Sequence, residues 1–297
     1  MSLIFTTNSN PILAKKITQL GNFTLGKTRI KTLRDGETYV QILNNTKGKK
    51  VFVIGSTFQP EKNLIELVLL LDALVNNQTK KIVLILPYFG YARQDRVDQP
   101  GEPLSARLMA RFLKLAGASQ IITIDLHSSK AAKFFGQSLK QLSALEYLAK
   151  KFGHKFSTKN FIVISPDKGA QTRAGLVAKT LGNLPLIVVK KYRPKPNVAQ
   201  IMEIPDNIRG KSLIIVDDMV DTAGTLVALV KMLKKKGAAK IYCLITHPLL
   251  SPPAIPRLKR SPIQEFWTTD SIPLPLSKRL AKIKVTGLAE FLTSELL

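Results

Sequence analysis

Cysteine, histidine and acidic residues are all scarce in this 297-residue sequence. The single cysteine, Cys243, excludes any disulfide within the chain. Because disulfide-free chains are typical of reducing compartments, we expect a cytoplasmic protein. Cys243 lies in the apolar run Ile241–Ile245, and its apolar neighbours in the sequence predict that the thiol is buried in the core.

Long apolar runs are also missing. A membrane-spanning helix needs roughly 18 or more consecutive apolar residues, and the longest candidate, Leu64–Val75, is interrupted by Glu66 and Asp72. The first residues lack the basic segment and long apolar segment of a secretory signal. We therefore expect no membrane partner.

The shortage of acids leaves the chain strongly basic. It has 20 Asp and Glu against 45 Lys and Arg, a formal net charge of +25, which attracts phosphates, nucleic acids and anionic lipid head groups. The aromatic signature of RNA-binding modules and the spacing of zinc fingers are absent. We interpret the charge as the basic surface of an anion-handling enzyme. The alternative, nucleic acid as the main partner, predicts an affinity that falls steeply with salt.

Apolar runs too short for a membrane alternate with amphipathic stretches. Runs rich in Ile, Val and Leu, without strict polar alternation, are typical of parallel strands covered on both faces. The expected strands are Val51–Ile54, Lys81–Leu86, Ile121–Ile124, Phe161–Ile164, Leu186–Val189, Leu213–Val216 and Ile241–Ile245. The expected helices are Asn63–Leu74, Ser105–Ala116, Gln141–Lys151, Gly169–Leu181 and Gly224–Lys236. The alternation predicts an α/β fold with mainly parallel sheets.

One segment of the chain is echoed later in the sequence. Gly117–His127 and Gly237–His247 both pass from Gly-Ala through an apolar run to a histidine, 120 residues apart. The echo favours two related α/β halves, which we expect to span residues 1–144 and 145–297.

The segment with the strongest chemical signal is Val216–Thr225. It joins an apolar run to an amphipathic stretch, and a strand, turn and helix N-terminus in this order form a phosphate site. The two adjacent acids at its start suit ribose hydroxyls or a metal, at the strand end where open α/β sheets bind ligands. The candidate ligand-binding residues are Asp217, Asp218, Asp221, Thr222, Ala223, Gly224 and Thr225.

This segment resembles the ribose-phosphate-binding fingerprint that phosphoribosyltransferases share with ribose-phosphate pyrophosphokinases. Further segments, from about residue 33 to residue 275, resemble the pyrophosphokinases. The resemblance implies two phosphoribosyltransferase-like domains, with ATP on residues 1–144 and ribose 5-phosphate on residues 145–297. It also implies transfer of the β,γ-diphosphoryl group of ATP to the C1 hydroxyl of ribose 5-phosphate.

The segment Pro87–Arg96 resembles the ATP-binding segment of that family. Arg93 and Arg96 can neutralise a triphosphate, although charge alone fits an exposed basic loop equally well. The resemblance assigns ATP contacts to Arg93, Gln94 and Asp98.

Two strand-end motifs resemble the metal side of the family's site. Ile124–His127 matches the Asp-Leu-His motif, whose histidine, here His127, contacts metal and ATP. Ser165–Ala170 matches the Ser-Pro-Asp motif, with Asp167 as the metal-binding carboxylate. Magnesium typically takes one or two protein ligands beside phosphate oxygens and water, so we expect Mg²⁺ as the cofactor.

The segment Lys190–Asn207 is rich in proline and lysine, which disfavours a helix or a central strand and predicts a moving loop. It resembles the family's flexible catalytic loop, whose Lys-x-Arg pair maps onto Lys191 and Arg193. Such cations stabilise charge on transferring phosphoryl groups. A solvated basic loop is the alternative interpretation.

Leu33–Glu37 resembles a segment that, in the family, reaches the adenine across a subunit interface. The resemblance adds Asp35 and Glu37 to the ATP contacts and implies a homo-oligomer. The family usually has an aromatic residue where Leu33 stands, so weaker adenine stacking is expected.

Two rival functions share parts of this pattern. A non-catalytic regulatory relative should lack the Lys-x-Arg loop or the metal histidine, and this chain has both. A phosphoribosyltransferase would need neither the Arg93–Arg96 segment nor a second related half. Departures from the family at Lys168, at Gly101 and in the last eight residues leave these motifs intact, but weaken any expectation of regulation by ADP or phosphate.

Overall fold

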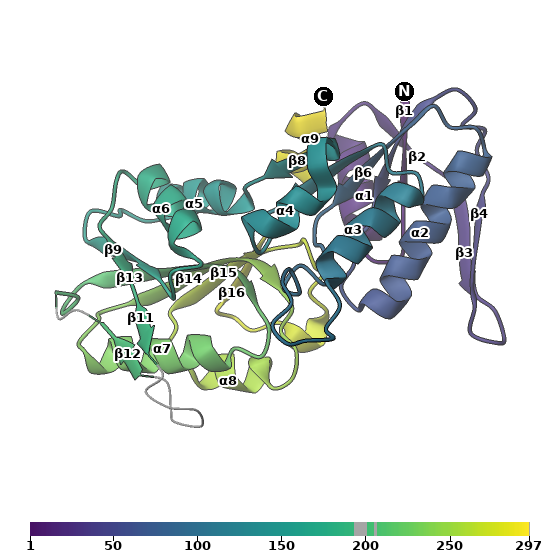
Figure 1. Ribbon diagram of the computed structural model, residues 1–297. Helices are drawn as coiled ribbons and strands as arrows, with labels where there is room; N and C mark the ends of the chain where they lie inside the picture. The colour runs from purple at the N-terminus through teal and green to yellow at the C-terminus, as the bar shows by residue number, and fades with distance from the viewer. Residues whose placement is uncertain (193–200, 205–206, 297) are drawn as a thin grey trace. The chain divides into compact units, whose positions relative to one another are not determined.

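The computed structural model describes residues 1–192, 201–204 and 207–296, which form two compact units (Figure 1). Unit 1 consists of Met1–Leu142, Ser271–Pro273 and Gly287–Leu297, and unit 2 of Ser143–Asp270 and Leu274–Thr286. The expected range 145–297 placed every C-terminal residue in the second half, whereas Ser271–Pro273 and Gly287–Leu297 belong to unit 1. The expected fold class, two related α/β domains with mainly parallel sheets, is confirmed.

The elements of each unit follow in chain order. Unit 1 contains β1 (Ser2–Thr6), α1 (Pro11–Leu20), β2 (Phe23–Leu25), β3 (Thr28–Thr32), β4 (Thr38–Ile42), β5 (Lys50–Ile54), α2 (Pro60–Asn76), β6 (Lys81–Leu86), α3 (Ser105–Leu115), β7 (Gln120–Ile124), α4 (Ser129–Phe135), η1 (Gly136–Ser138), β8 (Leu139–Leu142) and α9 (Ala289–Leu296). Unit 2 contains α5 (Ala144–Lys155), β9 (Phe161–Ser165), α6 (Gln171–Thr180), β10 (Leu186–Val188), β11 (Lys190–Tyr192), β12 (Ile201–Glu203), β13 (Ser212–Val220), α7 (Gly224–Lys235), β14 (Ile241–Pro248), α8 (Ala254–Arg260), β15 (Glu265–Thr269), η2 (Leu276–Lys278) and β16 (Ile283–Thr286).

Each unit is built on a six-stranded sheet in which all neighbouring strands run parallel. The strand order is β2-β1-β5-β6-β7-β8 in unit 1 and β10-β9-β13-β14-β15-β16 in unit 2. Alternate residues of a strand enter different cores: Leu213 and Ile215 of β13 belong to one cluster, Ile214 and Val216 to another. A strand buried on both faces must be apolar throughout, which explains the absence of alternation in the sequence.

The matching strand orders show that the two units repeat one topology, with β1 equivalent to β9, β5 to β13 and β6 to β14. The sequence echo also indicated a duplication, but it paired two strands that are not equivalent in the two repeats. Gly117–His127 contains β7 and Gly237–His247 contains most of β14, but β7 is equivalent to β15. A helix that ends at Gly-Ala before a buried strand recurs in any α/β chain, so the echo was a local coincidence.

The last helix of each repeat belongs to the other unit. Helix α5 follows β8, the last strand of the first repeat, yet it belongs to unit 2 and packs on α6. Helix α9 follows β16, the last strand of the second repeat, yet it belongs to unit 1 and packs on α1. Because α1 and α6 are equivalent in the two repeats, the exchange is reciprocal.

A local signal explains where α5 begins. The helix expected over Gln141–Lys151 begins instead at Ala144, because Leu139–Leu142 forms β8 and Ser143 caps the helix. The Ser143 hydroxyl accepts a hydrogen bond from the Glu146 amide at 3.4 Å, as an N-cap serine should. Among the residues described, no helix has the length and apolar character needed to cross a membrane.

Two antiparallel hairpins stand apart from the parallel sheets, β3 with β4 and β11 with β12. Figure 1 shows the β3–β4 hairpin of unit 1 beside α2. The second hairpin corrects part of the expectation of a loop over Lys190–Asn207, since Lys190–Tyr192 and Ile201–Glu203 within that segment are strands. Residues 193–200 and 205–206 within it lie outside the described residues.

Candidate functional site

The two adjacent acids of the strongest motif lie inside β13 rather than after it. We expected the strand to end at Val216, but it continues to Val220, and Asp217 pairs in register with Ile245 of β14. The Asp218 side chain is 2% exposed and that of Asp217 is 31% exposed. A fully buried carboxylate is rare in proteins unless a partner compensates its charge.

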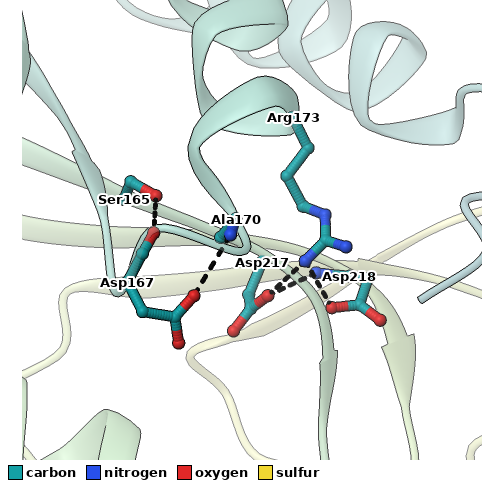
Figure 2. Close-up of polar contacts among 6 residues, drawn as sticks. All are labelled: Ser165, Asp167, Ala170, Arg173, Asp217 and Asp218. Carbon is teal, nitrogen blue, oxygen red and sulfur yellow. Dashed lines mark hydrogen bonds and ion pairs between the residues drawn. The ribbon is translucent and has the colours of Figure 1, made fainter. Parts of the chain in front are cut away.

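Arg173 of α6 is that partner. Figure 2 shows its side chain descending from the helix to both carboxylates. One guanidinium nitrogen, Nη1, lies 3.0 Å from Oδ1 of Asp217 and 2.7 Å from Oδ1 of Asp218. Sequence reasoning missed Arg173. A signal was nevertheless present, since a basic residue lies at the start of the helix that follows the Ser165–Ala170 motif.

The environment of Asp217 favours its protonated form. Burial, followed by the negative charge of Asp218, raises the pKa of Asp217 from its ordinary 3.8 to about 7, while the charge of Arg173 acts in the opposite direction. Two carboxylates so close together cannot both ionise cheaply. The two carboxylates therefore share one nitrogen of Arg173, and burial favours the neutral form of Asp217.

Asp167 caps the turn that leads from β9 into α6. Its Oδ1 atom accepts a hydrogen bond from the Ala170 amide at 3.1 Å, and its backbone oxygen accepts one from the Ser165 hydroxyl at 2.7 Å (Figure 2). Because β9 and β13 are adjacent parallel strands, Asp167 and the Asp217–Asp218 pair come from the same edge of the sheet.

Asp167 could serve as a single carboxylate ligand of a metal ion. In the described part of the chain, no three His, Cys, Asp or Glu side chains gather into a metal-binding group. Magnesium commonly binds through one or two carboxylates and takes its other ligands from phosphates and water. The Asp167 carboxylate, held in place by the Ala170 amide, is a donor of that kind.

The turn after β13 is shaped to receive an anion. Ala223 has left-handed backbone angles, φ 59° and ψ 11°, and stands at the N-cap of α7 without a side-chain cap. The first amide groups of a helix lack partners within the helix, and a methyl group cannot accept their hydrogen bonds. The start of the twelve-residue helix α7 thus presents N–H donors and the positive end of a helix dipole beside Thr222 and Thr225.

In unit 1, neighbouring strand ends bring the expected ATP residues together. Arg93 and Gln94 follow β6, and His127 follows the adjacent strand β7. Asp95 accepts a hydrogen bond from Ser128, which links the two loops directly beside His127. Gln94 is anchored to α3, since its side-chain oxygen accepts a hydrogen bond from the Ser105 hydroxyl at 2.6 Å.

The remaining expected ATP contacts lie on exposed loops. Asp98 forms an ion pair with Arg96 at 2.8 Å, and both side chains are well exposed. Asp35 and Glu37 lie at the exposed tip of the β3–β4 hairpin, where the Asp35 carboxylate accepts the Glu37 amide at 3.1 Å.

The expected catalytic cations fall on the least described part of the chain. Lys191 lies in β11 by its backbone, and Arg193 lies outside the described residues. Both keep the status of sequence-based predictions.

Comparisons with known proteins cover nearly the whole chain. The profile of the N-terminal domain of ribose phosphate pyrophosphokinase matches residues 2–117, and that of the phosphoribosyl synthetase-associated domain matches residues 159–296. The chain is 43% identical over 295 residues to a ribose-phosphate pyrophosphokinase of Caldanaerobacter subterraneus, covering 99% of this chain and 93% of that one. It is 40% identical over 284 residues to one of Fusobacterium nucleatum, covering 95% and 90% of the two chains.

A solved structure gives the same result in three dimensions. The crystal structure of phosphoribosylpyrophosphate synthetase from Mycobacterium smegmatis superposes with a TM-score of 0.91 at 31% identity, covering 99% of this chain and 97% of that one.

Proposed function

The chain belongs to the ribose-phosphate pyrophosphokinase family, and from this premise we propose which of its residues carry out the family's reaction. The enzyme transfers the β,γ-diphosphoryl group of ATP to ribose 5-phosphate. The C1 hydroxyl oxygen forms a bond to the β-phosphorus and loses its proton. The bond from that phosphorus to the oxygen shared with the α-phosphate breaks, so the products are 5-phosphoribosyl 1-diphosphate and AMP.

The observation that carries the proposal is the start of α7, without a side-chain cap, after the two acids of β13, of which Asp218 is buried. The 5-phosphate of the sugar accepts hydrogen bonds from the backbone of Asp221–Thr225 and from the hydroxyls of Thr222 and Thr225. Ala223 and Gly224 allow the close approach of the phosphate. A dianion at this helix terminus is stabilised by the local dipole.

Asp217 and Asp218 accept hydrogen bonds from the ribose ring hydroxyls. Arg173 forms ion pairs with both carboxylates and compensates their charge. The hydroxyls of the incoming sugar replace part of that compensation. They favour the ionised form of Asp217, because hydrogen bonds to a carboxylate lower its pKa.

ATP binds in this proposal to Arg93, Gln94, Asp98 and His127 of unit 1, with Asp35 and Glu37 directed to the adenine. The side-chain oxygen of Gln94 already accepts the Ser105 hydroxyl, so its NH₂ group is the donor for the nucleotide. His127 and Asp167 are the residues that would hold Mg²⁺. When bound, this ion neutralises charge on the phosphate oxygens.

Lys191 and Arg193 stabilise the diphosphoryl group during transfer. Phosphoryl transfer depends on positioning and on compensation of oxygen charge, for which a lysine and an arginine are suited. We further propose a cytoplasmic homo-oligomer in which the β3–β4 hairpin of one copy reaches the nucleotide of another. The exposed tip of that hairpin supports this arrangement.

A ³¹P NMR time course with ATP, ribose 5-phosphate and Mg²⁺ tests the proposal. We expect AMP and a C1-linked diphosphate from the wild-type enzyme, and a rate at least about a hundredfold lower from Lys191→Ala/Arg193→Ala. Lys231→Ala/Lys235→Ala is the matched control, since it removes the same charge from exposed positions of α7. ADP as the product would contradict diphosphoryl transfer. An unaffected Lys191→Ala/Arg193→Ala variant would remove these two residues from the proposal.

A further inference from the structure

An arginine outside every motif considered so far lies against the phosphate-binding turn. Nη1 of Arg257, in α8, donates a hydrogen bond to the backbone oxygen of Thr222 at 3.0 Å. A Cβ atom placed on Gly224 would lie 3.2 Å from the same nitrogen. The guanidinium therefore lies directly over the backbone where α7 begins, and this close approach is one reason for a glycine at position 224.

The backbone that carries Arg257 is fixed by the core. Ala254 and Leu258, the residues three before and one after it, are both 0% exposed, and α8 packs on α7. The Arg257 side chain is exposed to solvent. An exposed cation on an anchored helix is suited to meet a soluble anion with little rearrangement.

The cations around this turn have different partners. Arg173 is engaged by Asp217 and Asp218. Lys278 donates a hydrogen bond to the Leu249 oxygen at 2.8 Å, and burial lowers its pKa, while the charge of Asp221 acts in the opposite direction. Arg257 instead donates one of its five N–H groups to a backbone oxygen. The bonded partner is neutral rather than a carboxylate, and the positive charge lies at the turn.

We propose that Arg257 binds the 5-phosphate of ribose 5-phosphate and makes the enzyme prefer the phosphorylated sugar to free ribose. The inference rests on the proposed function of the Asp221–Thr225 turn and adds a charged side chain to a site otherwise made of backbone amides and hydroxyls. The geometry favours this role because arginine forms strong, directional hydrogen bonds with phosphate oxygens.

A cycle of two proteins and two sugars tests the proposal. Dissociation constants for ribose 5-phosphate and for ribose are measured by calorimetry with wild type and Arg257→Ala, and turnover is measured with ATP and Mg²⁺. We expect Arg257→Ala to weaken ribose 5-phosphate binding about tenfold, because a hydrogen bond to a charged group at an exposed position is worth about that factor. Ribose binding and the KM for ATP should not change.

Two further variants sharpen the comparison. Arg257→Lys keeps the charge and should recover part of the affinity for ribose 5-phosphate. Arg260→Ala removes a neighbouring exposed cation of α8 and should have no effect. Equal losses for both sugars would show that Arg257 supports the sugar site as a whole rather than the 5-phosphate, and no loss for either would show that it does not contact the ligand.

The same data separate this proposal from the broader one. If wild type binds ribose 5-phosphate but forms no AMP, the proposed function fails while the dissociation constants still decide the role of Arg257. If AMP forms and Arg257→Ala matches wild type in every constant, the proposed function stands and the role of Arg257 is refuted.

Discussion

Replacement of Asp217 by asparagine should make the ligand-free enzyme more stable at neutral and alkaline pH. The folded protein raises the pKa of this carboxyl from 3.8 to about 7. Between these values it holds a proton that the unfolded chain releases, so stability falls as the pH rises through this window. Asparagine has a similar shape but no proton to lose, so the variant should not show this part of the decline.

The magnitude follows from the same rise in pKa. At about 1.4 kcal/mol for each pH unit, a rise from 3.8 to about 7 corresponds to about 4 kcal/mol as an upper bound. Solvent around a side chain that is 31% exposed screens part of this, and asparagine forms a weaker bond to Arg173. We expect Asp217→Asn to be more stable by about 1–2 kcal/mol at about pH 8, with a smaller gain at about pH 5.

The fluorescence of Trp267 allows a measurement confined to the relevant unit. It is the only tryptophan in the sequence, lies in β15 of unit 2 and is 8% exposed. Urea unfolding of both proteins, followed at this residue at the two pH values, gives the difference directly. Glu146→Gln, which removes a partly exposed charge from the same unit, should leave the pH dependence unchanged.

Lower stability of Asp217→Asn would contradict this prediction. If Asp217→Asn is less stable than wild type at both pH values, the attraction of Arg173 outweighs the penalty of burial, and the acidic pair stabilises the fold. If the variant is more stable and has also lost affinity for ribose 5-phosphate, the protein retains an acid that destabilises its empty form because the substrate requires it.

Two further predictions concern other parts of the chain. Ser128→Ala removes both the N-cap of α4 and the link to Asp95, so the KM for ATP should rise several-fold while that for ribose 5-phosphate stays constant in steady-state kinetics. An unchanged KM for ATP would show that this link does not position His127. The Cys243 thiol is 0% exposed, and burial raises its pKa far above the usual range, so it should react with a thiol reagent only after unfolding in urea. Reaction of the native protein at the rate of the unfolded one would contradict the core assignment.

The expected strands and helices were predicted close to their observed positions because their signals are local. Residues Ile82–Leu86 of β6 are apolar throughout, and the amphipathic stretch from Gly224 ends within one residue of the expected position. Errors arose where a boundary depends on a neighbour in space. Strand β13 continues past Val216 because β14 provides hydrogen-bonding partners as far as Pro248.

The candidate site shows the same division. The turn between β13 and α7 could be predicted, because strand, small residues and helix start are consecutive in the sequence. Arg173 could not be paired with Asp217 and Asp218, since 44 and 45 residues separate them. Arg257 was equally hidden, because it reaches Thr222 from a helix 35 residues further along the chain.

The sequence by itself determined the α/β class, the order of the expected strands and helices and the motifs by which the chain resembles its family, since each depends on residues close together in the chain. Only the tertiary structure decided that α5 and α9 pack in the unit of the other repeat, that β6 rather than β7 is equivalent to β14, and that Arg173 faces the acids of β13. The physical reason is that an amphipathic helix shows which of its faces is buried, but not the surface that buries it.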